Sequence, residues 1–416
     1  MTRSAPVSDG GGATLFLAHR VPFPPDRGDK MRSFHMLKAL AALGPVHLLA
    51  FTDDARDEEL AIGLDAYVAS RLLVRRNLAV PIAGFRALAD GTPYSLASFD
   101  HPRIAARVTA LLDSGAIDRI FVFSGQMAQY VPVAWLARTI VDFGDVDSAK
   151  FGDYAAAASR FSPMRAVYAR EDRELARFEA QIARYAARSL FVSEAEADLF
   201  RARSGLGEDK VVAIDNGIDL DFYNPGVALA EPDIAPDGPL VVFTGQMDYR
   251  PNIEAVERFA RQVLPRLRIK VPGARFAIVG RHPAPRVCAL DRLEGVIVTG
   301  AVDDVRSWLA AADVVVAPLQ IARGVQNKVL EAMAMAKPIV VSPAAAQGID
   351  ASDGTHFIVA DSAGAQADAV AALIAEPARA AELGQAARAR VEARYAWDAT
   401  LAPLVELIEA LPRATT

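Results

Sequence analysis

Short apolar runs alternate along almost the whole chain with longer segments in which apolar residues recur at helical spacing, such as 253–270. Wholly apolar runs are typical of parallel strands buried on both faces, and the longer segments are typical of crossover helices. The runs of the first half lie at 14–18, 46–51, 71–74, 119–123, 139–142, 189–192 and 211–214. Those of the second half lie at 240–244, 275–279, 296–299, 314–317, 339–342 and 357–359. The pattern predicts an α/β fold in which one parallel-sheet arrangement occurs twice.

This repetition predicts two doubly wound, Rossmann-like domains that face a central cleft. We place the N-terminal domain at 13–223 and the C-terminal domain at 239–395. Residues 224–238 are rich in proline, which removes backbone donors, and suit an exposed linker. The last segment, 396–412, is predicted to be a helix that can pack back across the hinge.

Charge and composition narrow the classes of function. The 416 residues carry a formal net charge of -6, which gives no overall basic field for nucleic acid. Cys288 is the single cysteine, and the six histidines lack metal-ligand spacing, so we expect neither a disulfide nor a metal site. The first apolar run is too short for a signal peptide, and charges interrupt the most apolar region. We therefore expect a cytoplasmic protein that does not cross a membrane.

The most informative stretch, ARGVQNKVLEAMAMAKPIVVSP, starts at residue 322 and follows a predicted strand. Gly324 allows close backbone approach, Gln326 and Asn327 lie at the turn into a helix, and Asn327 can cap it. The helix start and Lys328 together suit a nucleotide diphosphate. Glu331 lies one turn further on, where its carboxylate can accept two ribose hydroxyls. The alternative is an ordinary surface Lys–Glu pair.

Two further strand ends in the second half carry candidate donor contacts. In FTGQMDYRPN, Gly245 lets the chain turn tightly, and Arg250 can reach the same diphosphate. In AIVGRHP, Gly280 and Arg281 end a strand at the same sheet edge and are candidates for base or phosphate contacts. The alternatives are a solvated arginine and a plain turn.

In the first half, the loop of HRVPFPPDRGDKMRSF projects toward the predicted cleft. Gly28 allows close approach to donor or acceptor, while Asp29 and Lys30 are candidates for acceptor binding. The loop is not a G-x-G-x-x-G dinucleotide fingerprint, which disfavours a hydride-transfer enzyme.

The stretch VDFGDVDSAKF places three acids just past another strand. Asp145 and Asp147 are candidates for binding acceptor hydroxyls, and Asp142 is the best acidic candidate for a catalytic base. The alternative is an acidic turn that caps a helix.

The arginine-rich stretch 165–189 has apolar residues at helical spacing with charges of both signs around them. It predicts a long, solvated helix, and the alternative is a surface that docks on anionic lipid.

These motifs, together with FVSEAEADLF and DNGIDLDFYNP, occur in the order typical of one family. The chain resembles the family 4/family 1 superfamily of GT-B glycosyltransferases, in particular sugar transferases of bacterial exopolysaccharide and PEP-CTERM/exosortase systems. The resemblance implies that the C-terminal domain binds a nucleotide-sugar, that the N-terminal domain binds the acceptor, and that transfer needs no metal. Glu331 matches the second glutamate of the family's E-x7-E element, but Arg323 stands where the first is expected.

The resulting prediction is a glycosyltransferase that moves a sugar, with retention of configuration, onto a glycan or polyprenyl-linked acceptor. The nucleotide-sugar is a substrate, and no cofactor is expected. Peripheral contact with the inner membrane face would bring a lipid-linked acceptor within reach. The alternatives are a nucleotide-sugar 2-epimerase of the same fold and a degenerate sugar-nucleotide-binding subunit that regulates polysaccharide assembly.

Overall fold

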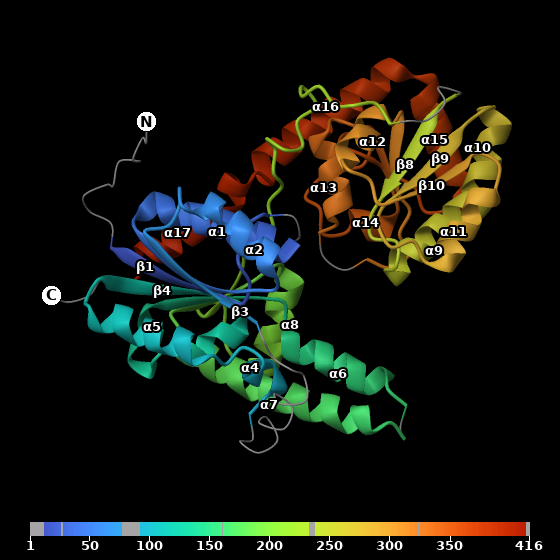
Figure 1. The fold of residues 1–416 in the computed structure, drawn as a ribbon. Coiled ribbons are helices and arrows are strands. Elements are labelled where there is room, and N and C mark those ends of the chain that lie inside the picture. Colours follow the sequence, from blue (N-terminus) through green and yellow to red (C-terminus); the bar gives the residue numbers. More distant parts are fainter. Residues whose placement is uncertain are drawn as a thin grey trace. The chain divides into compact units, whose positions relative to one another are not determined.

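The computed structural model describes residues 12–25, 28–76, 92–159, 161–232, 238–322 and 325–412, without the side chain at position 157. The chain divides into two compact units. Unit 1 comprises the described residues of Met1–Asp215 and Leu401–Thr416, and unit 2 comprises those of Asn216–Thr400. Each unit is built on one parallel sheet with helices around it (Figure 1). The predicted α/β fold with two Rossmann-like parallel-sheet domains is confirmed.

Among the described residues, unit 1 holds a seven-stranded sheet in the order β3-β2-β1-β4-β5-β6-β7. Its strands are β1 (Ala13–Ala18), β2 (Val46–Thr52), β3 (Ser70–Arg75), β4 (Ile117–Phe123), β5 (Thr139–Gly144), β6 (Arg188–Phe191) and β7 (Val211–Ala213). Each overlaps one predicted run. The inner strands are buried on both faces, and Leu15, Phe16 and Leu17 of β1 all have no exposed surface. This burial explains why the strands are continuous apolar runs.

Helices cover both faces of the unit 1 sheet. Leu15 and Leu17 share a core with Ile104 and Val108 of α5, and α1 lies on the opposite face (Figure 1). The helices are α1 (Gly28–Leu43), α2 (Ala55–Leu60), α4 (Tyr94–Ala97), α5 (Pro102–Asp113), α6 (Asp147–Ala157), α7 (Pro163–Tyr185) and α8 (Glu194–Ser204), with 3₁₀ turns η1 (Ala61–Leu64), η2 (Gly125–Tyr130) and η3 (Val133–Arg138). The long helix predicted from residue 165 is α7, which ends at Tyr185 because β6 follows at Arg188.

The described part of unit 2 holds a six-stranded sheet in the order β10-β9-β8-β11-β12-β13. Its strands are β8 (Leu240–Thr244), β9 (Arg275–Val279), β10 (Val296–Gly300), β11 (Val314–Ala317), β12 (Ile339–Val341) and β13 (Ile358–Val359). The order matches that of the first six strands of unit 1. In both sheets the strand order reverses beside the first strand, β1 or β8. Doubly wound sheets bind their ligands at this point, at the carboxyl ends of the strands.

The helices of unit 2 include one irregular element. They are α9 (Arg250–Arg258), η4 (Phe259–Val263), α10 (Leu264–Lys270), α11 (Pro285–Cys288), η5 (Ala289–Arg292), α12 (Val305–Ala311), α13 (Asn327–Ala334), α14 (Pro343–Ala346), α15 (Ala363–Ala375) and α16 (Pro377–Arg394). A last helix, α17 (Trp397–Glu409), begins in unit 2 and continues in unit 1. The helix predicted at 253–270 is α9, η4 and α10 in succession, and η4 is a π-helical turn. Pro265 lacks an N–H and its ring would clash with the carbonyl of Arg261 in a regular helix, so the wider turn accommodates it.

The division between the units falls after Asp215, before the linker placed at 224–238 from composition. The backbone N–H of Ile218 donates to the carbonyl of Tyr395 over 2.7 Å, and Arg306 Nη1 donates to the carbonyl of Phe222 over 2.8 Å. These bonds attach Ile218 and Phe222, which precede the predicted linker, to other residues of unit 2. Helix α17 begins in unit 2, and from Leu401 onward the chain belongs to unit 1.

The backbones that leave β8 and β9 come into direct contact. The N–H of Gly245 donates to the carbonyl of Val279 over 3.0 Å, and that of Met247 donates to the carbonyl of Arg281 over 3.0 Å. A Cβ atom added at Gly280 would lie 1.6 Å from the carbonyl oxygen of Gly245. Glycine is therefore required at position 280 by the close approach of the two chains.

The substitution Gly280→Ala tests this contact. We expect it to reduce the free energy of unfolding by more than about 3 kcal/mol, because the methyl group forces the two strand ends apart. Gly300→Ala, at the end of the adjacent strand β10, is the control. Its Cβ meets no described atom within 4 Å, and only its φ of 68° opposes the change, at a cost of about 1–2 kcal/mol. Urea unfolding that shows equal losses would contradict the proposed contact.

Candidate functional site

Three residues meet at the switch point of unit 2, between the carboxyl ends of β8 and β11. A Cβ added at Gly245 would lie 2.8 Å from Asn252 Nδ2 and 3.4 Å from Lys328 Cε. Gly245 directly follows β8, while Lys328 lies in the first turn of α13, after β11. The structure thus brings together Gly245, Gly280 and Lys328, which the sequence placed in one donor site.

Asn252 was not among the predicted site residues, although it lies in the motif that contains Gly245 and Arg250. Its side chain is buried, with 4% exposed, and Nδ2 donates to the carbonyl of Gln246 over 2.9 Å. Its Oδ1 atom is buried and accepts no hydrogen bond from the described part of the chain. An unsatisfied buried acceptor beside Gly245 and Lys328 is a feature that a bound ligand can satisfy.

Helix α13 presents its N-terminus beside this cluster. Asn327 was predicted as a cap, but it is the first helical residue and is exposed. Gln326 holds the cap position, and in the described structure its side chain makes no capping hydrogen bond. The first N–H groups of α13 are therefore not closed by a cap side chain, and they suit an anion. The predicted contact of Gly324 lies outside the described residues.

Lys328 and Glu331 are not an ordinary surface pair. Burial lowers the pKa of Lys328, and the Glu331 charge opposes that change. Burial likewise raises the pKa of Glu331, opposed by the charge of Lys328 and by a hydrogen bond with Tyr223. The Lys328 ammonium also lies 5.5 Å from the ring centroid of Phe243. Although the Glu331 residue as a whole is only half-buried, its carboxylate is desolvated.

Tyr223 is the second residue that the sequence did not single out for the site. It lies in DNGIDLDFYNP, one of the motifs that carry the family resemblance, but nothing in that motif predicts contact with Glu331. Its side chain is buried, and burial together with the nearby Glu331 charge raises the pKa of Tyr223. The phenol therefore stays protonated and can act as a hydrogen-bond donor toward the Glu331 carboxylate.

The two arginines predicted for this site lie in solvent. The Arg250 side chain is 82% exposed, and its Nε donates to Glu254 Oε1 over 2.7 Å along α9. Arg281 is exposed as well, and its backbone carbonyl accepts the bond from Met247. In this conformation neither arginine joins Lys328 and Glu331, so their contact with a diphosphate remains a prediction.

In unit 1, the catalytic candidate Asp142 has no exposed surface. Its Oδ2 accepts from Arg32 Nε over 2.8 Å and its Oδ1 from Arg32 Nη2 over 3.2 Å. Arg32 Nη1 also donates to the carbonyl of Ile214 over 2.8 Å. This ion pair ties α1 to β5 and to the end of β7. The geometry is that of a structural anchor and does not support a role for Asp142 as a base.

The acceptor candidates also form ion pairs. Lys30 is buried and donates to Asp57 Oδ1 over 2.6 Å, and Asp29 pairs with Arg20. Lys150 Nζ lies 2.9 Å from carboxylate oxygens of both Asp145 and Asp147, which are partly exposed. Gly28 starts α1, and a Cβ there would meet no described atom within 4 Å, so the protein itself does not require glycine at this position. Of the four charged candidates, Asp145 has the most exposed side chain, at 45%, and Asp29 and Asp147 are each 28% exposed.

Two further polar residues join Asp147 at the carboxyl end of β4. Ser124 has a φ of 78°, which is uncommon for a residue other than glycine, and its hydroxyl bonds the side chain of Gln126. Gln126 Nε2 then donates to Asp147 Oδ2 over 2.8 Å. The backbone strain at Ser124 has no signature in the sequence, so only the structure reveals this cluster.

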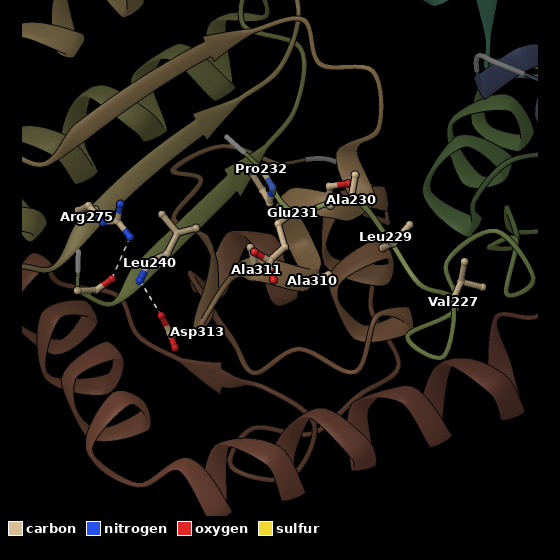
Figure 2. A pocket seen from close by; sticks show the side chains of 12 residues that line it. Val227, Leu229, Ala230, Glu231, Pro232, Leu240, Arg275, Ala310, Ala311 and Asp313 are labelled. Carbon is tan, nitrogen blue, oxygen red and sulfur yellow. Dashed lines mark hydrogen bonds between the residues drawn. The ribbon is translucent and has the colours of Figure 1, made fainter. Parts of the chain in front are cut away.

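A hollow of about 450 Å³ lies at the other edge of the unit 2 sheet, where the strands begin (Figure 2). Two of its polar side chains make structural hydrogen bonds, because Asp313 Oδ2 accepts from the N–H of Leu240 over 2.7 Å and Arg275 Nη2 donates to the carbonyl of Gly238 over 3.0 Å. Doubly wound sheets bind ligands at the carboxyl ends of their strands, so we do not assign the site to this hollow.

Comparisons with known proteins agree with the geometry. Residues 238–376, all within unit 2, match the family model described as Glycosyl transferases group 1. The structure of Anabaena Alr3699/HepE in complex with UDP superposes with a TM-score of 0.61 at 15% identity, covering 96% of this chain and 100% of that one. A glycosyltransferase from Rickettsia africae gives 0.62 at 14% identity, with coverages of 97% and 99%. The chain therefore has the GT-B fold, and unit 2 carries the group 1 glycosyl transferase pattern.

Curated relatives align over only part of their length. The alpha-maltose-1-phosphate synthases of two Mycobacterium tuberculosis strains, CDC 1551 / Oshkosh and ATCC 25618 / H37Rv, are 30% identical over 229 residues. The alignment covers 48% of this chain and 57% of each relative, so the chain spans little more than half the length of these proteins.

Two searches of the described residues bear on metals and membranes. Those residues contain no group of three or more His, Cys, Asp or Glu side chains that could hold a metal ion. No helix among them combines the length and apolar character that crossing a bilayer requires.

Asp142→Ala tests the anchor in unit 1. Because it removes the carboxylate that pairs with the buried Arg32 guanidinium, we expect a loss of about 3–5 kcal/mol in the free energy of unfolding measured in urea. Asp145→Ala, which breaks a partly exposed pair, serves as control and is expected to cost about 0–1 kcal/mol. The double substitution of Arg32→Met and Asp142→Leu should recover much of the loss. If instead Asp142→Ala left stability intact and abolished turnover, Asp142 would be catalytic.

Glu331→Gln tests the desolvated carboxylate. Because the folded pKa is raised above the unfolded value of about 4.3, the native state binds more protons and ionisation destabilises it. The neutral amide of the introduced glutamine mimics the protonated acid and therefore avoids the cost of ionisation. We expect the variant to unfold at a higher temperature than wild type, with a gain that grows as pH rises above about 4.3 and then levels off. A gain confined to acid pH would refute the assignment.

Proposed function

We propose that the chain is a glycosyltransferase that moves a sugar from a nucleotide-sugar donor to a glycan or lipid-linked acceptor. The match of residues 238–376 to group 1 glycosyl transferases and the GT-B fold support this activity. The match favours transfer over 2-epimerisation and over a purely regulatory subunit.

The observation that carries the donor assignment is the cluster at the switch point of unit 2. Gly245, Asn252 and Lys328 surround the start of α13, where N–H groups and a positive charge suit a diphosphate. Glu331 lies one turn further on, and its carboxylate can accept the two hydroxyls of a ribose. The solved structures of HepE with UDP and with UDP-glucose support a nucleoside-diphosphate sugar as the donor class.

In the proposed reaction, Lys328 and the N–H groups of α13 stabilise the negative charge that develops on the departing nucleoside diphosphate. This stabilisation needs no metal ion. The sequence resemblance leads us to expect retention of configuration. The leaving phosphate can act as the base, because Asp142 is held by Arg32. Asp145 and Asp147 are the proposed contacts to acceptor hydroxyls.

We propose a role in bacterial exopolysaccharide or cell-surface glycan synthesis, in the cytoplasm or at the inner membrane face. The sequence resemblance supports this setting. A polyprenyl-linked acceptor would require the chain to work against a lipid surface.

A thermal-shift panel of UDP-, GDP-, ADP- and dTDP-sugars tests the donor site. We expect one nucleotide class to raise the melting temperature of wild type, because a ligand that binds only the native state stabilises it. Glu331→Ala should weaken binding roughly 10- to 100-fold, as expected when charge-assisted hydrogen bonds to the ribose are lost. Lys328→Ala should weaken binding of the diphosphate-containing donor and not of the free nucleoside.

Glu382→Ala is the matched control, because Glu382 is an exposed helical glutamate on α16 of unit 2. Its donor-induced shift should equal that of wild type. No shift with any nucleotide-sugar would overturn the donor site. Conversion of the donor to an epimer without an acceptor would establish the epimerase instead.

A further inference from the structure

Helices α6 and α7 of unit 1 form a hairpin whose ends project away from the sheet (Figure 1). We call residues 151–170, at the turn between these helices, the hairpin tip. Aromatic side chains join the two helices there, with ring centroids of Tyr154 and Tyr168 5.7 Å apart and those of Phe151 and Tyr168 6.4 Å apart. These contacts give the tip a defined shape.

The hairpin tip exposes large apolar side chains. Phe161 is 88% exposed, Tyr154 54%, Val167 51% and Met164 44%. Met164 and Val167 are three residues apart on α7 and so lie on one side of that helix. Single exposed apolar residues are common, but a group of four on one tip marks a surface that contacts something other than water.

The charge of the hairpin tip differs in sign from that of the chain. Among its described residues, Arg165 and Arg170 oppose Asp153, which gives 2 − 1 = +1, whereas the whole chain carries a formal net charge of -6. Arg165 is exposed and lies between Met164 and Val167 in the sequence. Arginines beside exposed aromatic and aliphatic side chains suit the boundary between anionic headgroups and acyl chains.

We propose that the hairpin tip docks on an anionic lipid bilayer, with Phe161, Met164 and Val167 entering the headgroup region and Arg165 contacting lipid phosphates. The proposal rests on the proposed function in one respect, because a lipid-linked acceptor gives the docking its purpose. Its evidence is the exposed apolar group and the local positive charge. Apolar and electrostatic attraction act together at such a surface, so loss of either weakens binding.

Vesicle co-sedimentation of the full chain tests the proposal. Wild type should bind vesicles of equal parts phosphatidylcholine and phosphatidylglycerol more tightly than vesicles of phosphatidylcholine alone. Arg165→Glu should weaken binding to the anionic vesicles roughly thirtyfold, because it removes one positive charge and adds a negative one. Phe161→Ser combined with Val167→Ser should weaken it by at least roughly tenfold.

Ile269→Ser is the matched control, because Ile269 lies on α10 of unit 2 and is 83% exposed. It should bind vesicles as wild type does. Equal losses in the control and the tip variants, or no preference of wild type for anionic vesicles, would overturn the proposal. A concentration-dependent dimer in sedimentation velocity that the tip variants abolish would also overturn the proposal. The hairpin tip would then contact a second copy of this chain instead of a bilayer.

The donor-induced thermal shift, measured on the same variants, separates this inference from the proposed function. Tip variants that lose vesicle binding and keep the donor shift support docking by the tip. Vesicle binding without any donor shift would sink the proposed function and leave the docking surface standing.

Discussion

The contact between the backbone of Gly280 and the carbonyl of Gly245 is the constraint on which the unit 2 site depends. It sets where the chain leaves β8, and so how near Gly245 comes to Asn252 and Lys328. A side chain at position 280 would move the end of β8 away from α13. The site is therefore built by two strand ends that touch, rather than by the residues that face the ligand alone.

Buried charges in this chain have two distinct uses. Asp142 and Arg32 satisfy each other on several atoms, and the pair joins elements of unit 1. Lys328 and Glu331 are desolvated without such mutual satisfaction, and their pKa shifts are both toward the neutral forms. Such groups destabilise the empty protein and are arranged in advance for a polar, charged ligand. The hydrogen-bond partners of a buried charged side chain, rather than its residue type, decide whether it anchors the fold or is arranged for a ligand.

The strands could be predicted because each depends on local composition, since a strand buried on both faces must be apolar throughout. Most residues of the unit 2 cluster could be predicted for a similar reason, because the carboxyl ends of parallel strands converge. The ion pairs of Asp142 and Lys30 could not be predicted, because their partners are remote in the sequence. Arg32 is 110 positions from Asp142, and Asp57 is 27 positions from Lys30. The contact of Tyr223 with Glu331 is equally remote in the sequence. Composition places the linker at 224–238, whereas Ile218, before that segment, already bonds to Tyr395 of unit 2.

Helix α17 has a consequence for how such a chain can evolve. Because the chain returns to unit 1 after Thr400, unit 1 is encoded by two separate stretches with unit 2 between them. A single genetic crossover near residue 215 would join a foreign first half to a helix end that evolved against another core. An exchange of the whole of unit 1 between relatives would need two coordinated crossovers. New properties of unit 1 should therefore arise mainly by point substitution and loop change within it.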